Sequence, residues 1–316
     1  MKMAFFADSL QSFNIKKDST MAMMVEAASR GWDIYAFCEQ DIVLVEGRVI
    51  ALCDHIQLSG KFDADWYSVI GSGEMLLADF DAIVVRKDPP FDIHYVMALW
   101  LLSLAEKQGA RVFNTADSLL THNEKLTVGQ FPQFVKPTLV TADAERIRQF
   151  HEQYQDVILK PLIGMGGMGI FRVQADGLNL GTIIETLTDN GRQPLMAQAY
   201  IPEITGGDKR VLLINGKVVP FSLARIPKIG EIRGNLAAGG IGRAQPLSSR
   251  DMEIAETLVP VFAARGLFLV GLDIIGDWLT EVNVTSPTCF REITDQTGFN
   301  VAGLFIDELE KTLSQH

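Results

Sequence analysis

Short apolar runs alternate with longer amphipathic stretches through the first third of the chain. The apolar runs have the length and composition of strands: Met3–Ala7, Asp33–Phe37, Ala82–Val85 and Arg111–Asn114. The stretches between them predict helices over Ser19–Arg30 and His94–Gln108. Strands that alternate with helices in this way favour an α/β layer built on a parallel sheet.

The pattern changes after a mixed stretch that contains Pro132 and Pro137, which interrupt regular structure. We therefore predict an N-terminal α/β domain over residues 1–120 and a second unit over residues 121–316. Between Lys136 and Arg225 short strands with hairpin signals outnumber helices, which indicates an α+β arrangement. The helices predicted in the second unit cover Glu145–Gln155, Leu180–Asn190, Ser249–Arg265 and Val301–Leu313.

A glycine-rich stretch follows the apolar run that ends at Lys160. It matches G-x-G-x-x-G from Gly164 to Gly169 and includes Gly166 and Gly167. A dinucleotide fingerprint requires a helix after the glycines, whereas Ile170–Val173 favours a strand. A P-loop is excluded as well, because no Gly-Lys-Ser or Gly-Lys-Thr closes the stretch. We therefore predict a β-hairpin whose glycine loop covers phosphates beside the lysine, with a plain flexible hairpin as the alternative.

Two strands near the C-terminus carry acids among apolar residues, over Leu267–Ile275 and Leu279–Val284. Glu281 and Asn283 are two residues apart and share a face, and their oxygens suit Mg²⁺. Asp273 is the third candidate ligand. A three-residue turn would place it opposite Glu281, so the metal interpretation calls for an odd-length loop. The alternative is a hairpin whose acids face water.

Composition restricts the classes of function. The chain has 316 residues, 47% of them hydrophobic, and a formal charge of −11, which disfavours nucleic acid and anionic membranes as partners. Cys38, Cys53 and Cys289 form no C-x-x-C pair, which fits a reducing compartment, so we predict the cytoplasm. We find no signal or membrane segment, no zinc spacing among the histidines and no catalytic serine motif.

An anionic substrate for this acidic chain needs a local basic pocket. The candidates are Arg86, Arg210, Arg225 and Arg233, and each taken singly is better explained by an exposed position. Arg86 has further support, because it follows an apolar strand at the edge where α/β sheets bind their ligands. The glycine-rich stretch Ile226–Gly242 has the length and irregularity of an active-site lid.

Several blocks of sequence, in this order and spacing, resemble the bacterial glutathione synthetases, which are ATP-grasp enzymes. The blocks are Arg86–Asp92, Lys160–Leu162 before the glycines, Gly207–Val211, Arg233–Gly240 and Glu281–Thr288. The resemblance implies an ATP-grasp fold behind an N-terminal α/β domain, with ATP held between two subdomains. These subdomains would cover about 121–200 and 201–316, with the lid at 226–242.

The resemblance also implies the chemistry. In this family ATP drives the joining of γ-L-glutamyl-L-cysteine to glycine through an acyl phosphate, and glutathione, ADP and phosphate are released. The alternatives are another ATP-grasp carboxylate-amine ligase and an ATP-binding regulatory protein without turnover. The family further implies Mg²⁺, or Mn²⁺, as cofactor and a homotetramer.

The resemblance also implies which residues form the site. The nucleotide would contact Lys125, Lys160, Gly164, Gly166, Gly167, Gln198, Tyr200, Ile201 and Asp208. The metal would bind Asp273, Glu281 and Asn283. The dipeptide and the developing acyl phosphate would contact Arg86, Arg210, Arg225, Arg233, Asn283 and Ser286, of which Arg210, Arg225 and Arg233 would be catalytic.

Overall fold

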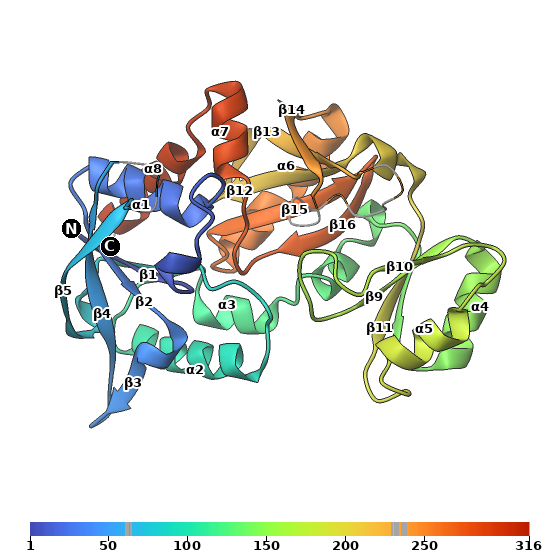
Figure 1. Cartoon of the computed structure of the whole chain (residues 1–316), viewed down its shortest axis with the longest axis horizontal. Coiled ribbons are helices and arrows are strands. Elements are labelled where there is room, and N and C mark those ends of the chain that lie inside the picture. The colour runs from blue at the N-terminus through green and yellow to red at the C-terminus, as the bar shows by residue number, and fades with distance from the viewer. Residues whose placement is uncertain (61–62, 64, 229, 231–233, 235–238, 316) are drawn as a thin grey trace.

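The computed structural model describes residues 1–60, 63, 65–228, 230, 234 and 239–315. Three sheets organise these residues (Figure 1). The first is seven-stranded with the order β3-β4-β2-β1-β6-β7, and β5 pairs with β4. Its strands are β1 (Lys2–Phe6), β2 (Asp33–Phe37), β3 (Ile42–Val45), β4 (Arg48–Leu58), β5 (Tyr67–Leu76), β6 (Ala82–Val85) and β7 (Val112–Phe113).

The first sheet is parallel only in part. Strands β1, β2, β6 and β7 pair in parallel, as the alternation of strands and helices predicts. Strand β4 runs antiparallel to β2, β3 and β5, and the three strands β3 to β5 are absent from the sequence prediction. Much of β5 is exposed, so its apolar and polar positions do not alternate with the period of a half-buried strand. The prediction of a wholly parallel layer is therefore wrong at this edge.

Helices α1 (Ser19–Ser29), α2 (Ile93–Lys107) and α3 (Ala116–Thr121) belong to the same part of the chain. The first two match their predicted ranges within one residue. Asp18 caps α1 by accepting a hydrogen bond from Met21 N at 2.8 Å.

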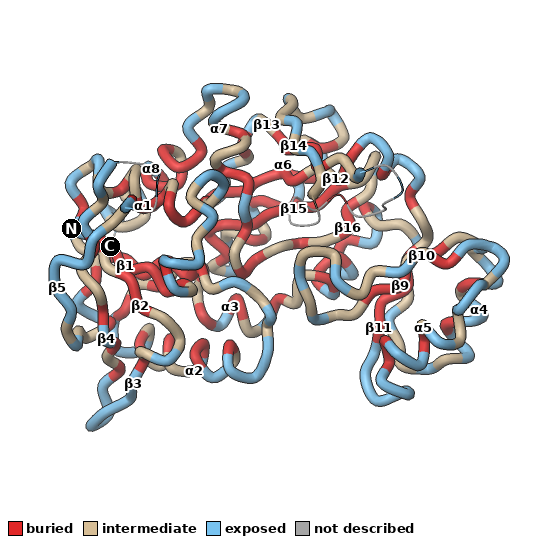
Figure 2. The backbone as a smooth tube through the Cα atoms, in the orientation of Figure 1, coloured by how far each residue is buried: buried red, intermediate tan, exposed pale blue. Residues whose placement is uncertain are grey.

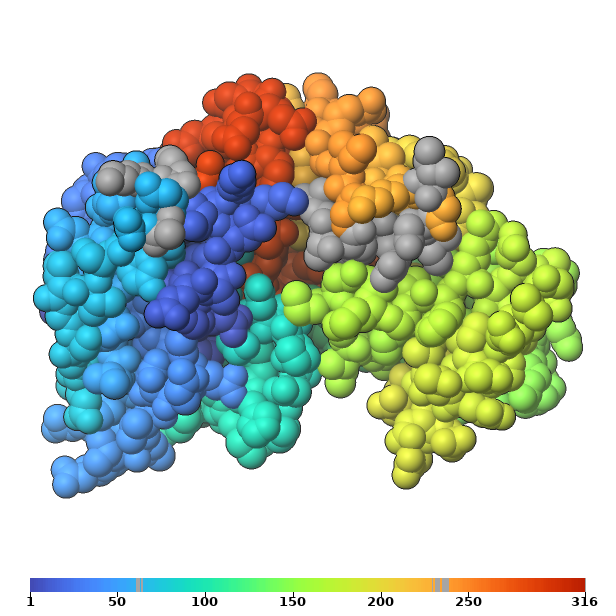
Figure 3. All heavy atoms as spheres, in the orientation of Figure 1, coloured from blue at the N-terminus to red at the C-terminus, as the bar shows by residue number. Residues whose placement is uncertain are grey.

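The second sheet forms a small lobe that stands apart from the rest of the molecule along one side, in green and yellow in Figure 3. Its order is β10-β9-β11-β8, and its helices enclose a separate apolar core. The elements are β8 (Thr138–Thr141), α4 (Ala144–Tyr154), β9 (Val157–Pro161), β10 (Phe171–Val173), α5 (Leu180–Leu187) and β11 (Leu195–Ala199). Strands β9 and β10 are antiparallel, which confirms the predicted hairpin around the glycines.

The third sheet is antiparallel with the order β14-β13-β12-β15-β16. Its strands are β12 (Asp208–Ile214), β13 (Lys217–Ile226), β14 (Ile241–Pro246), β15 (Leu269–Ile275) and β16 (Trp278–Asn283), and its helices are α6 (Ser249–Ala264), α7 (Phe290–Thr297) and α8 (Val301–Ser314). Buried residues concentrate along β12 and β15 (Figure 2), so both faces of this sheet are covered.

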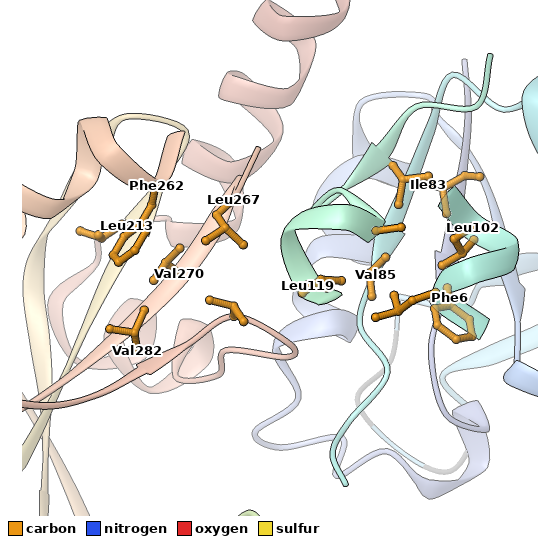
Figure 4. Close-up of a cluster of buried hydrophobic side chains, with 14 of the residues drawn as sticks. Phe6, Ile83, Val85, Leu102, Leu119, Leu213, Phe262, Leu267, Val270 and Val282 are labelled. Carbon is orange, nitrogen blue, oxygen red and sulfur yellow. The ribbon is translucent and has the colours of Figure 1, made fainter. Parts of the chain in front are cut away.

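Alternate residues of β12 enter two different cores. Leu213 belongs to the cluster that includes Phe6 and Leu102 of the first sheet's layer (Figure 4), whereas Leu212 belongs to the cluster around α1, α7 and α8. The first and third sheets are therefore parts of one packed body. Among the described residues, no helix has both the length and the apolar composition that crossing a bilayer requires.

Candidate active site

A cavity of about 300 Å³ lies between the second and third sheets. Side chains from both sheets and from the glycine loop line it, and the set includes most of the residues singled out from the sequence. These are Lys125, Lys160, Gly164, Gly166, Gly167, Gln198, Tyr200, Ile201, Asp208, Arg210, Arg225, Asp273, Glu281, Asn283 and Ser286. A volume of this size suits a small-molecule ligand.

Two buried lysines meet one acid at the bottom of the cavity. Lys160 Nζ, on β9, lies 3.4 Å from Glu281 Oε1 and donates to Thr280 O at 3.3 Å. Lys125 Nζ lies 4.0 Å from the same carboxylate oxygen and donates to Gly164 O at 3.2 Å. Burial lowers the pKa of Lys160, although Glu281 favours its charged form. Cations held out of water beside backbone amides of a glycine loop suit a polyphosphate.

In the acidic hairpin Asp273 lies opposite Glu281, as the metal interpretation requires, but a bulge and not the turn length is the cause. Ile275 pairs with Trp278, so the turn has two residues, and the condition that the metal interpretation needs an odd-length loop is wrong. A bulge between Asp273 and Ile274 in the pairing then shifts β16 by one position, which places Asp273 opposite Glu281. The extra residue is Thr280, whose Oγ1 donates to Asp273 O at 3.0 Å. A bulge can therefore re-aim side chains that the turn length alone would place on opposite faces.

An ion-pair network occupies the wall next to this hairpin. Asp273 accepts from Arg210 Nε at 2.6 Å and lies 2.8 Å from Arg225 Nη2. Arg225 also pairs with Asp208 at 2.5 Å. Burial by itself would raise the pKa of Asp273, but the two arginines outweigh it and hold that pKa well below its usual range. Burial raises the pKa of Asp208 to about 7, although Arg225 opposes the rise.

The donor set of the hairpin fits a hard divalent cation bound together with a substrate. Asp273, Glu281 and Asn283 offer two carboxylates and one amide oxygen, although both carboxylate oxygens of Asp273 also face Arg210 or Arg225. Asn283 donates through Nδ2 to Gly271 O at 3.3 Å, which turns its oxygen away from that carbonyl. The described residues contain no cluster of three or more His, Cys, Asp or Glu that would hold a metal unaided. Mg²⁺ commonly takes one or two carboxylates and completes its shell with phosphate oxygens and water, so the set is compatible with it.

Another part of the cavity wall is apolar and aromatic. Ile158, Ile170, Ile204 and Ile275 line it together with Tyr200. Such a wall suits a flat base, as the sequence prediction for residues 198–201 supposes.

Tyr200 is held in place by an ion pair outside the cavity lining. The Arg172 guanidinium lies 3.6 Å from the centre of the Tyr200 ring and pairs with Asp156 at 2.6 and 2.9 Å. Asp156 O in turn accepts from Tyr200 N at 2.9 Å. Because Arg172 is on β10, this pair links the glycine hairpin to the segment that follows β11.

If the cavity binds ATP, as the sequence resemblance implies, Arg172→Ala is expected to raise the KM for ATP roughly fivefold and to leave the KM of the second substrate unchanged, since a cation–π contact and its orientation of Tyr200 are lost. Steady-state kinetics with one substrate varied at a time measures this. Arg192→Ala is the matched control, because Arg192 is an exposed arginine of the same lobe paired with Asp189. An unchanged KM for ATP in Arg172→Ala would contradict the prediction.

Arg86 and Arg233 are the remaining predicted substrate residues. Arg86 does not line the cavity, and its buried guanidinium donates to Thr20 Oγ1 at 3.0 Å and to Pro287 O at 2.9 Å. It therefore holds the turn that carries Ser286, and a direct contact with substrate stays a prediction. Arg233 lies outside the described residues, as does much of the predicted lid, of which 226–228, 230, 234 and 239–242 are described.

Sequence reasoning missed Glu124 in this cavity. Burial raises the pKa of Glu124, and its carboxylate accepts hydrogen bonds from the chain that follows β16. Nothing in the local sequence distinguishes Glu124 from an exposed acid before a lysine. Cys289 also lines the cavity, and all three cysteines are free, as the reducing-compartment prediction requires.

A lysine-bearing sheet with a glycine hairpin that faces an acidic antiparallel sheet across a nucleotide-sized cavity defines an ATP-grasp ligase. The fold is similar to that of a solved D-cycloserine synthetase, DcsG, with a TM-score of 0.70 at 15% identity, over 99% of this chain and 100% of that one. Family models for the prokaryotic glutathione synthetase N-terminal domain and ATP-grasp domain match residues 1–119 and 124–298.

Full-length relatives agree with these matches. The chain is 58% identical over 312 residues to the glutathione synthetase of Ralstonia nicotianae, covering 98% of this chain and 96% of that protein. It is 52% identical over 317 residues to that of Nitrosomonas europaea, covering 100% and 99%. The chain belongs to the prokaryotic glutathione synthetase family.

Proposed function

We propose that this ligase joins γ-L-glutamyl-L-cysteine to glycine, with ATP converted to ADP and phosphate. The observation that carries the proposal is the meeting of Lys125 and Lys160 with Glu281, beside an acidic strand pair in which Asp273 stands opposite Glu281. Two buried ammonium groups and several carboxylate oxygens lie within one small cavity, and this supports binding of a polyphosphate together with a divalent cation. Family membership supports the choice of the dipeptide and glycine as substrates.

The reaction needs no protein nucleophile. The cysteinyl carboxylate attacks the γ-phosphorus of ATP, and ADP leaves. The glycine amine then attacks the acyl phosphate carbon, loses a proton, and phosphate departs as the amide forms. Arg210 and Arg225 are proposed to face the negative charge that grows on the phosphoryl group and on the tetrahedral intermediate, where fixed cations are effective because the site is shielded from water.

Nucleotide and metal residues are proposed to divide the cavity between them. The glycines at 164, 166 and 167 and the two lysines would bind phosphates, Gln198, Tyr200 and Ile201 would contact the adenine, and Asp208 the ribose. Asp273, Glu281 and Asn283 would hold Mg²⁺, or Mn²⁺, which when bound neutralises phosphate charge. Ser286 would contact the dipeptide. The division of the chain near residues 120 and 200 would separate the units that close on ATP.

The test is to incubate the protein with ATP, Mg²⁺, γ-glutamylcysteine and glycine while measuring phosphate and product mass, with each component omitted in turn. Tripeptide formed one-for-one with phosphate, and only with all components, is the expected result. Phosphate release that depends on a different acceptor would assign another carboxylate-amine ligase. Nucleotide binding without turnover would assign a regulatory role.

A homo-oligomer in the cytoplasm, tetrameric as the family resemblance implies, completes the proposal. Support comes from α2, where Ile93, Met97 and Trp100 are 53%, 50% and 56% exposed and recur at helical spacing, so they share one face. An apolar face of this kind is typical of a protein interface.

Trp100→Glu is expected to lower the molar mass in solution, because a charge would be buried without a partner if a second copy covers α2. Size-exclusion chromatography with light scattering measures the mass. Leu178→Glu serves as the control, since Leu178 is a 70% exposed apolar residue on the small lobe. Equal masses for both variants and the unmodified protein would remove α2 from the interface.

A further inference from the structure

Glu124 bridges two segments that are distant in sequence. Its Oε1 accepts hydrogen bonds from Val284 N at 3.1 Å, from Thr285 N at 3.3 Å and from Thr285 Oγ1 at 2.8 Å. Its backbone O accepts from Val282 N at 2.9 Å. Three donors that converge on one oxygen make a directional anchor, because each hydrogen bond restricts where that oxygen and its donors can lie.

The two bridged segments carry opposite halves of the phosphate end of the cavity. On one side, Lys125 follows Glu124 directly, and its Nζ lies 4.0 Å from Glu281 Oε1. On the other side, Val282 and Val284 alternate with Glu281 and Asn283, so a bond to the backbone of 282 and 284 sets the position of the acidic residues between and beside them.

Asn123 strengthens the same anchor from the lysine side. Its Oδ1 accepts from Lys125 N and Leu126 N at 3.0 Å each, and its Nδ2 donates to Leu162 O at 3.3 Å. The segment 123–125 is thereby fixed both to the glycine hairpin of the second sheet and to β16 of the third. The Lys125 side chain also reaches the glycine hairpin, where its Nζ donates to Gly164 O at 3.2 Å.

We propose that Glu124 is a positioning residue that sets the distance between Lys125 and the acidic strand, and so the affinity for nucleotide with its divalent cation. The inference rests on the proposed function only for its kinetic readout. In this proposal Glu124 acts as a hydrogen-bond acceptor, because its Oε1 accepts three hydrogen bonds from residues 284 and 285.

The experiment compares Glu124→Ala, Glu124→Gln and Thr285→Val in the full chain. Glu256→Ala is the matched control, since Glu256 is an exposed acid on α6. Calorimetry with Mg²⁺ and a non-hydrolysable ATP analogue gives nucleotide affinity, and kinetics gives kcat and the KM of each substrate. Circular dichroism and thermal unfolding establish that each variant is folded.

Glu124→Ala is expected to weaken nucleotide binding and raise the KM for ATP by about 10–100-fold, with a much smaller change in the KM for γ-glutamylcysteine. Glu124→Gln keeps an acceptor oxygen and is expected to restore most of that loss at every pH tested. Thr285→Val removes one donor and is expected to act in the same direction by about fivefold. Adding it to Glu124→Ala should have little further effect, because the two side chains share one interaction.

Three results would overturn the inference. Glu124→Gln as impaired as Glu124→Ala would mean that the charge or the proton matters and not the acceptor. Wild-type nucleotide affinity in Glu124→Ala would mean that the anchor does not set the site. If Glu124→Ala does not fold, unchanged binding in Thr285→Val decides against it. Because the binding assay needs no ligation, a failure of the proposed function leaves this test intact.

Discussion

Lys160→Met is expected to lower kcat/KM for ATP by about 10²–10³-fold, the cost typical of losing one fixed electrostatic contact to transferring charge. Lys160 is buried, and its Nζ lies 3.4 Å from Glu281 at the floor of the cavity. Methionine has a similar length and no charge, so the change removes the cation while it fills the same space.

The same variant is expected to be at least as stable as the unmodified protein. Burial lowers the pKa of Lys160, so the ammonium ion is less favourable in the folded chain than in water. Removing a strained functional charge commonly raises stability at the expense of activity. Thermal unfolding and ATP kinetics, measured on one preparation, check the expected stability and the expected loss of activity. Lys217→Met is the control, because Lys217 is exposed on β13. Activity within tenfold of wild type would contradict the assignment of Lys160 to phosphate binding.

Asp273→Asn is expected to destabilise the protein by about 3–5 kcal/mol and to abolish ligation. Asparagine has the same shape, but Arg210 and Arg225 would lose the carboxylate that both contact. Breaking a buried ion pair by removing one partner leaves an uncompensated charge, which is far more costly than an exposed pair is worth. Activity would fall because the same carboxylate belongs to the proposed metal site.

The stability difference between wild type and Asp273→Asn is expected to change with pH in one direction. The folded-state pKa of Asp273 is held below its usual range, so the carboxylate contributes stability above its unfolded pKa of about 4. That contribution is lost as pH falls through the folded value. The stability difference between wild type and Asp273→Asn should therefore be full at neutral pH and shrink in acid below about pH 4. Denaturant unfolding at a series of pH values measures it. A difference that stays constant into strong acid would mean that charge is not its source.

Glu281→Gln is expected to separate the loss of activity from the loss of stability that follows when an acid is removed from this hairpin. Glu281 is less buried than Asp273, and its ion pairs within the described part of the chain are with Lys125 and Lys160. We expect a loss of activity of roughly 100-fold or more, since even an outer partner of a metal site is worth about 10–100-fold, with little change in stability. Comparing Glu281→Gln with Asp273→Asn shows whether the loss of an acid from the proposed metal-binding hairpin impairs activity or folding more.

Local pattern was sufficient for much of the fold. The capped helix after Asp18, the glycine hairpin after Lys160 and the acidic strands near residue 280 all follow from periodicity, caps and turn residues, and each is present in the structure. The exposed strand β5 did not follow, because a strand with little burial on either face lacks the alternation that marks strands in sequence.

For the candidate site too, the sequence indicated some residues and missed others. Residue types at Lys160, Glu281 and Asn283 indicate phosphate and metal chemistry without any structure, because charged and amide groups among apolar strand residues are costly unless they have a use. Glu124 gives no such signal, since its partners are more than 150 residues away along the chain. The bulge that places Asp273 opposite Glu281 also escaped prediction, because Thr280 is the bulge residue and a bulge leaves no unambiguous mark in sequence.

The amino-acid sequence was enough to establish the class of fold, the glycine hairpin after Lys160 and the identity of most of the charged groups, since these depend on patterns within a few residues of each other. The long-range pairing of strands established which groups meet: Lys125 with Glu281, Arg225 with both Asp208 and Asp273, and Arg86 with the turn before α7 and not with the cavity. Those meetings depend on how sheets are ordered and packed, and contacts between segments this far apart have no periodicity to reveal them.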